Sequence, residues 1–187
     1  VGSATPSAGV LRRVVSTEIT SLDPQRPTGQ VATDIAAELF CGLTFFDRGG
    51  RLAPGCAQTW QASPDGLTWT FRLRENLRWS DGRPLTARDF VFTWRMMQSE
   101  HIVSPFHNSY AKRFFESVDA IDEHTLRIVG TRPSWRPLDD YAGLGPTPAH
   151  ATVLDADWVK RSNNQFQISP GPYVITEAVR GQSITFG

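Results

Sequence analysis

Residues 67–74 (LTWTFRLR) alternate strictly between apolar and polar side chains. Successive side chains of a β-strand point to opposite faces, so this alternation predicts a half-buried strand with Trp69 and Phe71 directed inward. Pro64-Asp65-Gly66 supplies a turn directly before this strand, and Trp60 belongs to the strand that precedes the turn. The pattern therefore predicts an antiparallel hairpin.

Further strands are indicated by short extended runs that flank turn residues. A β-branched run at residues 11–17 predicts a first strand. Three more hairpins are expected, pairing residues 43–47 with 51–56, 118–121 with 125–129, and 173–177 with 183–186. Antiparallel pairing between neighbours in sequence is thus the dominant strand arrangement that the sequence predicts.

Two segments have the apolar spacing of helices. Residues 30–40 carry apolar side chains at helical spacing and are followed by a glycine suited to a helix C-terminus. A second helix begins near Thr86, with Asp89 completing a capping-box pattern and one face lined by Phe90, Val91, Trp94 and Met97. The predicted class is α+β, with mixed, largely antiparallel sheets and flanking helices.

Charge and hydropathy exclude several kinds of partner. The 19 basic and 19 acidic residues cancel, so the chain has no electrostatic footprint for nucleic acid or an acidic membrane surface. No run approaches the ~18 consecutive apolar residues of a membrane span. Residues 1–10 have no signal-peptide pattern and are expected to form a flexible leader, either a tether left after export or a cloning remnant.

The two cysteines, Cys41 and Cys56, lack the spacing of a metal-binding pair. They could be two small buried apolar residues. They could also form a disulfide in an oxidising compartment, because folding back at Gly49-Gly50 brings both towards the open end of the same hairpin. Both interpretations remain open at this point.

The sequence offers no catalytic or metal-binding constellation. The histidines at 101, 107, 124 and 150 lack the spacing of a metal site, and no nucleophile-elbow, zinc-protease or phosphate-loop motif occurs. Asp139 and Asp140 are adjacent, so in an extended segment their carboxylates point apart. Trp60, Trp69, Trp79 and Trp94 lie on the inward side of their predicted elements, which favours core packing over sugar stacking. We therefore expect no enzyme, no cofactor and no metal.

Four motifs occur in an order typical of one family. They are SLDP at 21–24 with ELFCGL at 38–43, PGCAQTW at 54–60 with PDGLTWTFRLR at 64–74, LRWSDGRPLTARDFVFTW at 77–94, and VDAID at 118–122 with TLRI at 125–128 and GPY at 171–173. From about Leu11 to Phe186 the sequence resembles the family 5 solute-binding proteins, the oligopeptide-, dipeptide- and nickel-binding receptors of ABC importers. Cys41 and Cys56 depart from the residues common at their positions, so a disulfide is not implied by the resemblance.

The resemblance implies a periplasmic-binding-protein-like fold (class II, type C), in which two lobes close over a ligand. Residues 11–40 and 149–187 would then form part of lobe I, and residues 41–148 its extra subdomain. Lobe II would be absent. Because residues 183–186 form a strand that runs to the last position, the chain is expected to continue in its parent protein.

The resemblance also suggests ligand-binding residues. Thr28, Gly29 and Gln30 would border the ligand and bond its backbone, although Thr28 could equally cap the helix that starts at Gln30. The aromatic after Ser104-Pro105 would line the cleft wall, which points to Phe106 with His107 and Tyr110. Phe106 could instead be core beneath a loop.

The implied function is capture of oligopeptides or related solutes outside the cytoplasm for delivery to an ABC permease in the membrane. The receptor is expected to be a monomer that binds no nucleic acid and is periplasmic or a lipoprotein held at the outer face of the cytoplasmic membrane. A sugar- or nickel-binding member of the family and a structural or protein-interaction domain without a small ligand are the alternatives.

Overall fold

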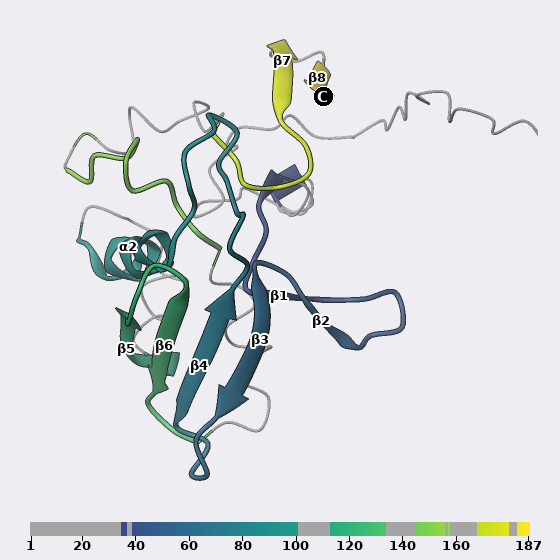
Figure 1. Cartoon of the computed structure of the whole chain (residues 1–187). Helices are drawn as coiled ribbons and strands as arrows, with labels where there is room; N and C mark the ends of the chain where they lie inside the picture. Colours follow the sequence, from purple (N-terminus) through teal and green to yellow (C-terminus); the bar gives the residue numbers. More distant parts are fainter. Residues whose placement is uncertain are drawn as a thin grey trace, which may run out of the picture.

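The computed structural model describes residues 35–36, 39–100, 113–133, 145–155, 157, 168–179 and 183–187. Its centre is a four-stranded sheet of β3 (Ala57–Ala62), β4 (Thr68–Leu73), β5 (Phe115–Ala120) and β6 (Thr125–Gly130) in the order β3-β4-β6-β5 (Figure 1). Every pair in it is antiparallel. The predicted strands around Trp60, at 67–74 and at 118–129 are thereby confirmed.

Alternation along β4 decides which face of the sheet is buried. Phe71 and Leu73 are fully buried, whereas Arg72 between them is exposed. Phe71 lies opposite Leu126 of β6, which is also fully buried, so apolar side chains of neighbouring strands share the same face. Each such side chain contributes roughly 1.5–3 kcal/mol of transfer free energy on burial.

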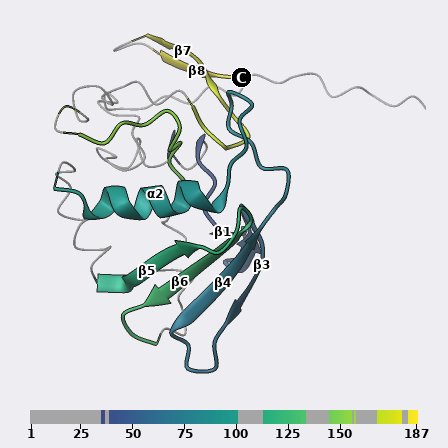
Figure 2. The same ribbon diagram turned by 60° about the vertical axis from the view of Figure 1, so that its left-hand side comes forward.

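Helix α2 (Ala87–Gln98) crosses this buried face and packs against β5 and β6 (Figure 2). Its fully or nearly fully buried residues include Phe90, Thr93, Met96 and Met97. The predicted stripe is confirmed: Phe90 and Met97 are buried, and Val91 and Trp94 are partly buried and pack against the core. Thr93, which the pattern did not include, is also buried, and its hydroxyl donates to the Asp89 carbonyl oxygen at 3.0 Å.

The predicted capping pattern at the start of α2 is confirmed. The backbone N–H of Thr86 donates to Asp89 Oδ2 at 2.9 Å, which supplies a partner to a donor that a helix start leaves unpaired. Asp89 also places a carboxylate in the first turn, where the helix dipole favours negative charge.

Two separate two-stranded sheets complete the described structure. One is the hairpin of β1 (Thr44–Phe46) and β2 (Leu52–Pro54), and the other is that of β7 (Ile175–Val179) and β8 (Ser183–Phe186). The turn between β1 and β2 uses Gly50 at φ 71°, a left-handed conformation that glycine adopts without a steric penalty. Both hairpins were predicted.

Of the predicted helix at 30–40, the described residues Ile35, Ala36 and Leu39 are helical, and Phe40 N–H donates to Ala36 O at 2.8 Å. The strand expected at 11–17 lies outside the described residues.

Trp79 is a core residue at 2% exposure, while Trp60, Trp69 and Trp94 are half-buried and pack against the core. Within the described part of the chain, no helix is long and apolar enough to cross a membrane. The α+β class is confirmed.

Candidate functional site

The six residues expected to contact ligand lie outside the described residues: Thr28, Gly29, Gln30, Phe106, His107 and Tyr110. These residues belong to two segments, and the structure describes the neighbouring helical turn and the helix and strand that flank them. The first segment precedes the helical turn that ends near Leu39. The second connects the end of α2 at Gln98 to the start of β5 at Phe115. The roles predicted for these residues therefore remain predictions.

The described residues do contain the junction at which three distant stretches of chain meet, here defined as residues 79–82, 89, 149–150 and 169. Ser80 N–H donates to Ser169 O at 2.9 Å, and Ser169 N–H donates back to Ser80 Oγ at 3.1 Å. This reciprocal pair fixes the turn at residues 79–82 against the segment that leads into β7. Ser169 is 2% exposed whereas Ser80 is exposed, so this pair of bonds lies at the boundary between the buried interior and the surface.

An acid–imidazole pair ties the same turn to a second segment. His150 Nε2 lies 2.8 Å from Asp81 Oδ2, and the His150 ring stands edge-on to Trp79 with centroids 6.2 Å apart. The pKa of Asp81 is lowered first by the Arg83 N–H, which donates to its carboxylate at 3.1 Å, and further by His150. The carboxylate is therefore held in its charged form.

Asp89 makes the third link of the junction. It is 5% exposed, and its Oδ1 accepts the Ala149 N–H at 3.2 Å while its Oδ2 caps α2. One buried carboxylate thus joins the helix start to the loop that carries His150. The sequence predicted only the capping half of this role.

A further contact connects the junction to the segment that follows the predicted ligand-bordering residues. Gly171 N–H donates to Leu39 O at 2.8 Å, and Leu39 is 1% exposed. Residues near 39 and 171 therefore lie side by side, as members of one lobe would. The division into lobe and subdomain itself remains a prediction.

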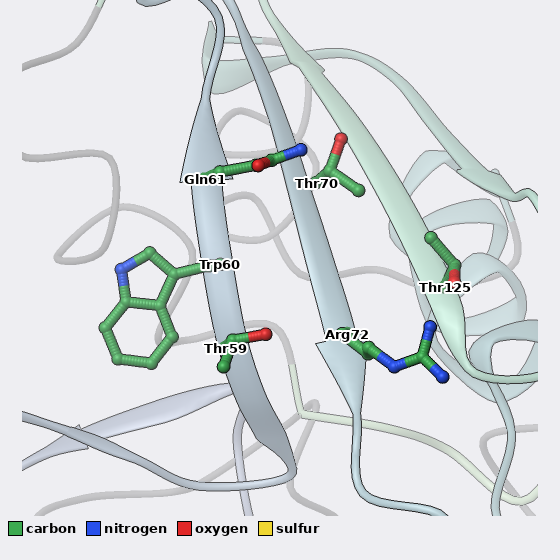
Figure 3. Close-up of a pocket in the computed structure, with 6 residues that line it drawn as sticks. All are labelled: Thr59, Trp60, Gln61, Thr70, Arg72 and Thr125. Carbon is green, nitrogen blue, oxygen red and sulfur yellow. The ribbon is translucent and has the colours of Figure 1, made fainter.

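An open hollow of about 330 Å³ lies on the other face of the four-stranded sheet, away from α2. Its lining includes Thr59, Gln61, Thr70, Arg72 and Thr125. Figure 3 shows Gln61 reaching towards Thr70 and Arg72 towards Thr125, while the Trp60 ring points away past the edge strand. The Arg72 guanidinium already faces Glu75 at 3.8 Å. This is an open, largely polar sheet face whose lining also includes Trp60, and it includes none of the predicted ligand residues.

Cys41 and Cys56 are free thiols in the structure rather than a disulfide. Cys56 Sγ donates to the Cys41 carbonyl oxygen at 3.2 Å, so the two residues are neighbours as the hairpin predicted.

Among the described residues, no group of three or more histidine, cysteine, aspartate or glutamate side chains could hold a metal ion.

The chain belongs to the bacterial extracellular solute-binding proteins of family 5. The profile described as "Bacterial extracellular solute-binding proteins, family 5 Middle" matches residues 51–187. Solved structures of periplasmic binding proteins share the fold, which confirms the resemblance seen in the sequence.

Among its relatives is the periplasmic murein peptide-binding protein MppA of Escherichia coli, 30% identical over 93% of this chain and 35% of the relative. Its solved structure aligns with a TM-score of 0.80 over 92% of this chain. The periplasmic oligopeptide-binding protein OppA of Haemophilus influenzae is 29% identical over 89% of this chain, and its complex with the peptide RPPGFSPFR aligns with a TM-score of 0.78 over 90% of this chain. The chain spans about a third of the length of these relatives.

Proposed function

We propose that the protein to which this chain belongs captures oligopeptides or related solutes outside the cytoplasm and delivers them to a membrane ABC permease. The observation that carries this is the close match of the chain to two peptide receptors with TM-scores of 0.78 and 0.80. Such a receptor works by binding and lobe closure, with no covalent chemistry, so no catalytic residue and no cofactor are required. We expect a monomer, periplasmic or lipid-anchored at the membrane surface, that binds no nucleic acid.

The ligand would lie against two segments. Thr28, Gly29 and Gln30 would bond the backbone of an extended peptide, because main-chain pairing gives affinity without reading side chains. Phe106, with His107 and Tyr110, would provide a flat wall that tolerates varied side chains. The bond between Leu39 and Gly171 would help to hold the first of these segments in place.

The direct test is mass spectrometry of small molecules that co-purify with the full-length protein, followed by calorimetric titration with synthetic peptides of three to five residues. Co-purified peptides and micromolar or tighter affinity are expected. A protein that carries no peptide and gives no heat with any of them would contradict the proposal.

The role of Phe106 needs its own comparison. In the full-length protein, Phe106→Ala is expected to weaken peptide binding roughly thirtyfold, as loss of a central aromatic contact does. Phe46→Ala is the matched control because Phe46 is 50% exposed on the β1–β2 hairpin. If Phe106→Ala lowers the thermal midpoint but leaves affinity unchanged, Phe106 is core and not cleft wall.

A second candidate ligand class is a metal–amino-acid complex. The solved structure of NikZ from Campylobacter jejuni in complex with Ni(L-His) aligns with a TM-score of 0.79 and 26% identity over 92% of this chain. Titration of the full-length protein with nickel and histidine together separates the two classes. Binding of this complex in place of peptide would favour the second.

A further inference from the structure

Two thiols meet at the root of the β1–β2 hairpin. Backbone pairing continues beyond the ends of the strands: Gly55 N–H donates to Leu43 O at 3.1 Å and Cys56 N–H to Gly42 O at 2.9 Å. Cys41 and Cys56 are fifteen positions apart, and this pairing carries both to the same end of the hairpin.

The two sulfur groups differ in access to solvent. Cys56 is fully buried, whereas Cys41 is partly exposed. The Cys56 thiol donates to the Cys41 carbonyl oxygen at 3.2 Å, and the Cys41 thiol donates to the Gly42 carbonyl oxygen at 3.4 Å. A reagent from solvent therefore reaches Cys41 first, and Cys56 lies directly behind it.

The surroundings make the two thiols chemically unequal. Hydrogen bonding with Cys56 and, to a lesser degree, the positive charge of Arg74 lower the pKa of Cys41 to about 7 against the opposing effect of burial. Arg74 is held close because its Nε donates to Gly55 O at 2.9 Å. The same thiol–thiol bond and burial raise the pKa of Cys56. Near neutral pH, Cys41 is the nucleophile and Cys56 keeps its proton.

We propose that Cys41 and Cys56 are a redox-active dithiol, which a disulfide-bearing oxidant outside the cytoplasm closes into a disulfide across the root of the β1–β2 hairpin. The family is extracellular, and that compartment permits disulfides. The proposal is independent of which ligand the protein binds.

The chemistry is ordinary thiol–disulfide exchange and needs one equivalent of oxidant. The Cys41 thiolate attacks one sulfur of the oxidant disulfide, forms a mixed disulfide and releases the other sulfur as a thiolate. Cys56 then gives up its proton to solvent and attacks the Cys41 sulfur, which expels the second oxidant thiolate. Two protein thiols are oxidised, the oxidant disulfide is reduced, and both released thiolates take up protons.

The bond would join the chain that leaves the helical turn at Leu39 to the start of β3. Closing this loop removes conformations from the unfolded chain, so the oxidised form should be harder to unfold. From the loop length, the urea midpoint is expected to rise by roughly 1–3 M.

The test uses the 187-residue chain, first reduced and then incubated with oxidised glutathione at pH 8. Tryptic digestion without reductant is informative because Arg48 and Arg51 lie between the cysteines. The expected result is one linked pair of peptides from a single monomer, loss of both free thiols and the rise in urea midpoint. Intermolecular dimers, persistent thiols, or an unchanged midpoint after linkage would overturn the proposal.

Single variants check the order of attack. Cys56→Ala should stop at a stable glutathione adduct on Cys41, and Cys41→Ser should form no adduct on the folded chain because Cys56 is buried. Rapid glutathionylation of Cys56 in the folded Cys41→Ser chain would contradict the assigned order. Because the main readout compares two redox states of one unmodified chain, it does not depend on any variant folding.

Discussion

Gly55 lies at a close approach of two backbone segments. A Cβ built at this position would be 2.5 Å from Gly42 O and 3.0 Å from Leu43 O, both of them backbone atoms that cannot rotate away. Gly55→Ala is therefore expected to lower the free energy of unfolding by about 1–3 kcal/mol, as overpacking does.

Urea unfolding followed by tryptophan fluorescence measures this cost. Gly145→Ala is the matched control, because a Cβ there would meet nothing within 4 Å. Equal free energies of unfolding for the two variants would show that the close backbone contact at Gly55 leaves room for a Cβ.

Cys41 offers a pH-dependent prediction at the same scale. Only the thiolate reacts with iodoacetamide, so a pKa lowered to about 7 makes the rate rise through pH 7 and level off above it. The hydrogen bond from Cys56 is the largest cause of the lowering, and therefore Cys56→Ala should move the midpoint upward towards the ordinary thiol range. A midpoint that stays in place in Cys56→Ala would show that the thiol–thiol bond is not the cause.

Among the elements, α2 depends on one buried carboxylate for two separate bonds. Asp89→Ala would leave the N–H groups of Thr86 and Ala149 without their acceptor. We expect a loss of about 1–2 kcal/mol in the free energy of unfolding, because two partly buried N–H groups lose their acceptor. Thermal and urea unfolding measure it.

The control for Asp89 is an exposed carboxylate that also has a partner. Asp119 pairs with Arg127 at 3.2 Å, but both side chains are nearly half exposed. Exposed pairs contribute about 0–1 kcal/mol, so Asp119→Ala should cost distinctly less. If both variants cost the same, the link to Ala149 contributes no stability.

The elements themselves were predictable because their signals are local. The alternation in β4, the glycine turn between β1 and β2, and the capping pair at α2 each depend on residues a few positions apart. The burial of Thr93 on α2 was not predicted, because its hydroxyl donates to the Asp89 carbonyl oxygen within the helix and this allows a polar residue to pack inward.

The junction could not be predicted in the same way. Its bonds join residues 69, 89 and 60 positions apart, and no periodicity couples such distant positions. The motif at 79–82 and the histidine after Pro148 were both visible in the sequence, but nothing local indicated that they meet. The ligand residues came from family resemblance alone and remain outside the described residues.

At the scale of the whole molecule, the length of this chain relative to its relatives predicts how much of the ligand-binding affinity it provides. The chain covers 36% of the OppA and MppA structures that it resembles. In a two-lobed receptor the ligand is enclosed by both lobes, so groups on one side provide only part of the affinity. The 187-residue chain is therefore expected to bind peptides at least a hundredfold more weakly than the full-length protein.

Calorimetric titration of both proteins with the same peptides, in the same buffer and redox state, measures this difference. The short chain must first show a cooperative urea transition, so that weak binding is not mistaken for an unfolded sample. Micromolar or tighter binding by the short chain would mean that its own residues hold most of the ligand. In that case the segments at 28–30 and 106–110 would be the principal site, and the other lobe would serve mainly to report closure to the permease.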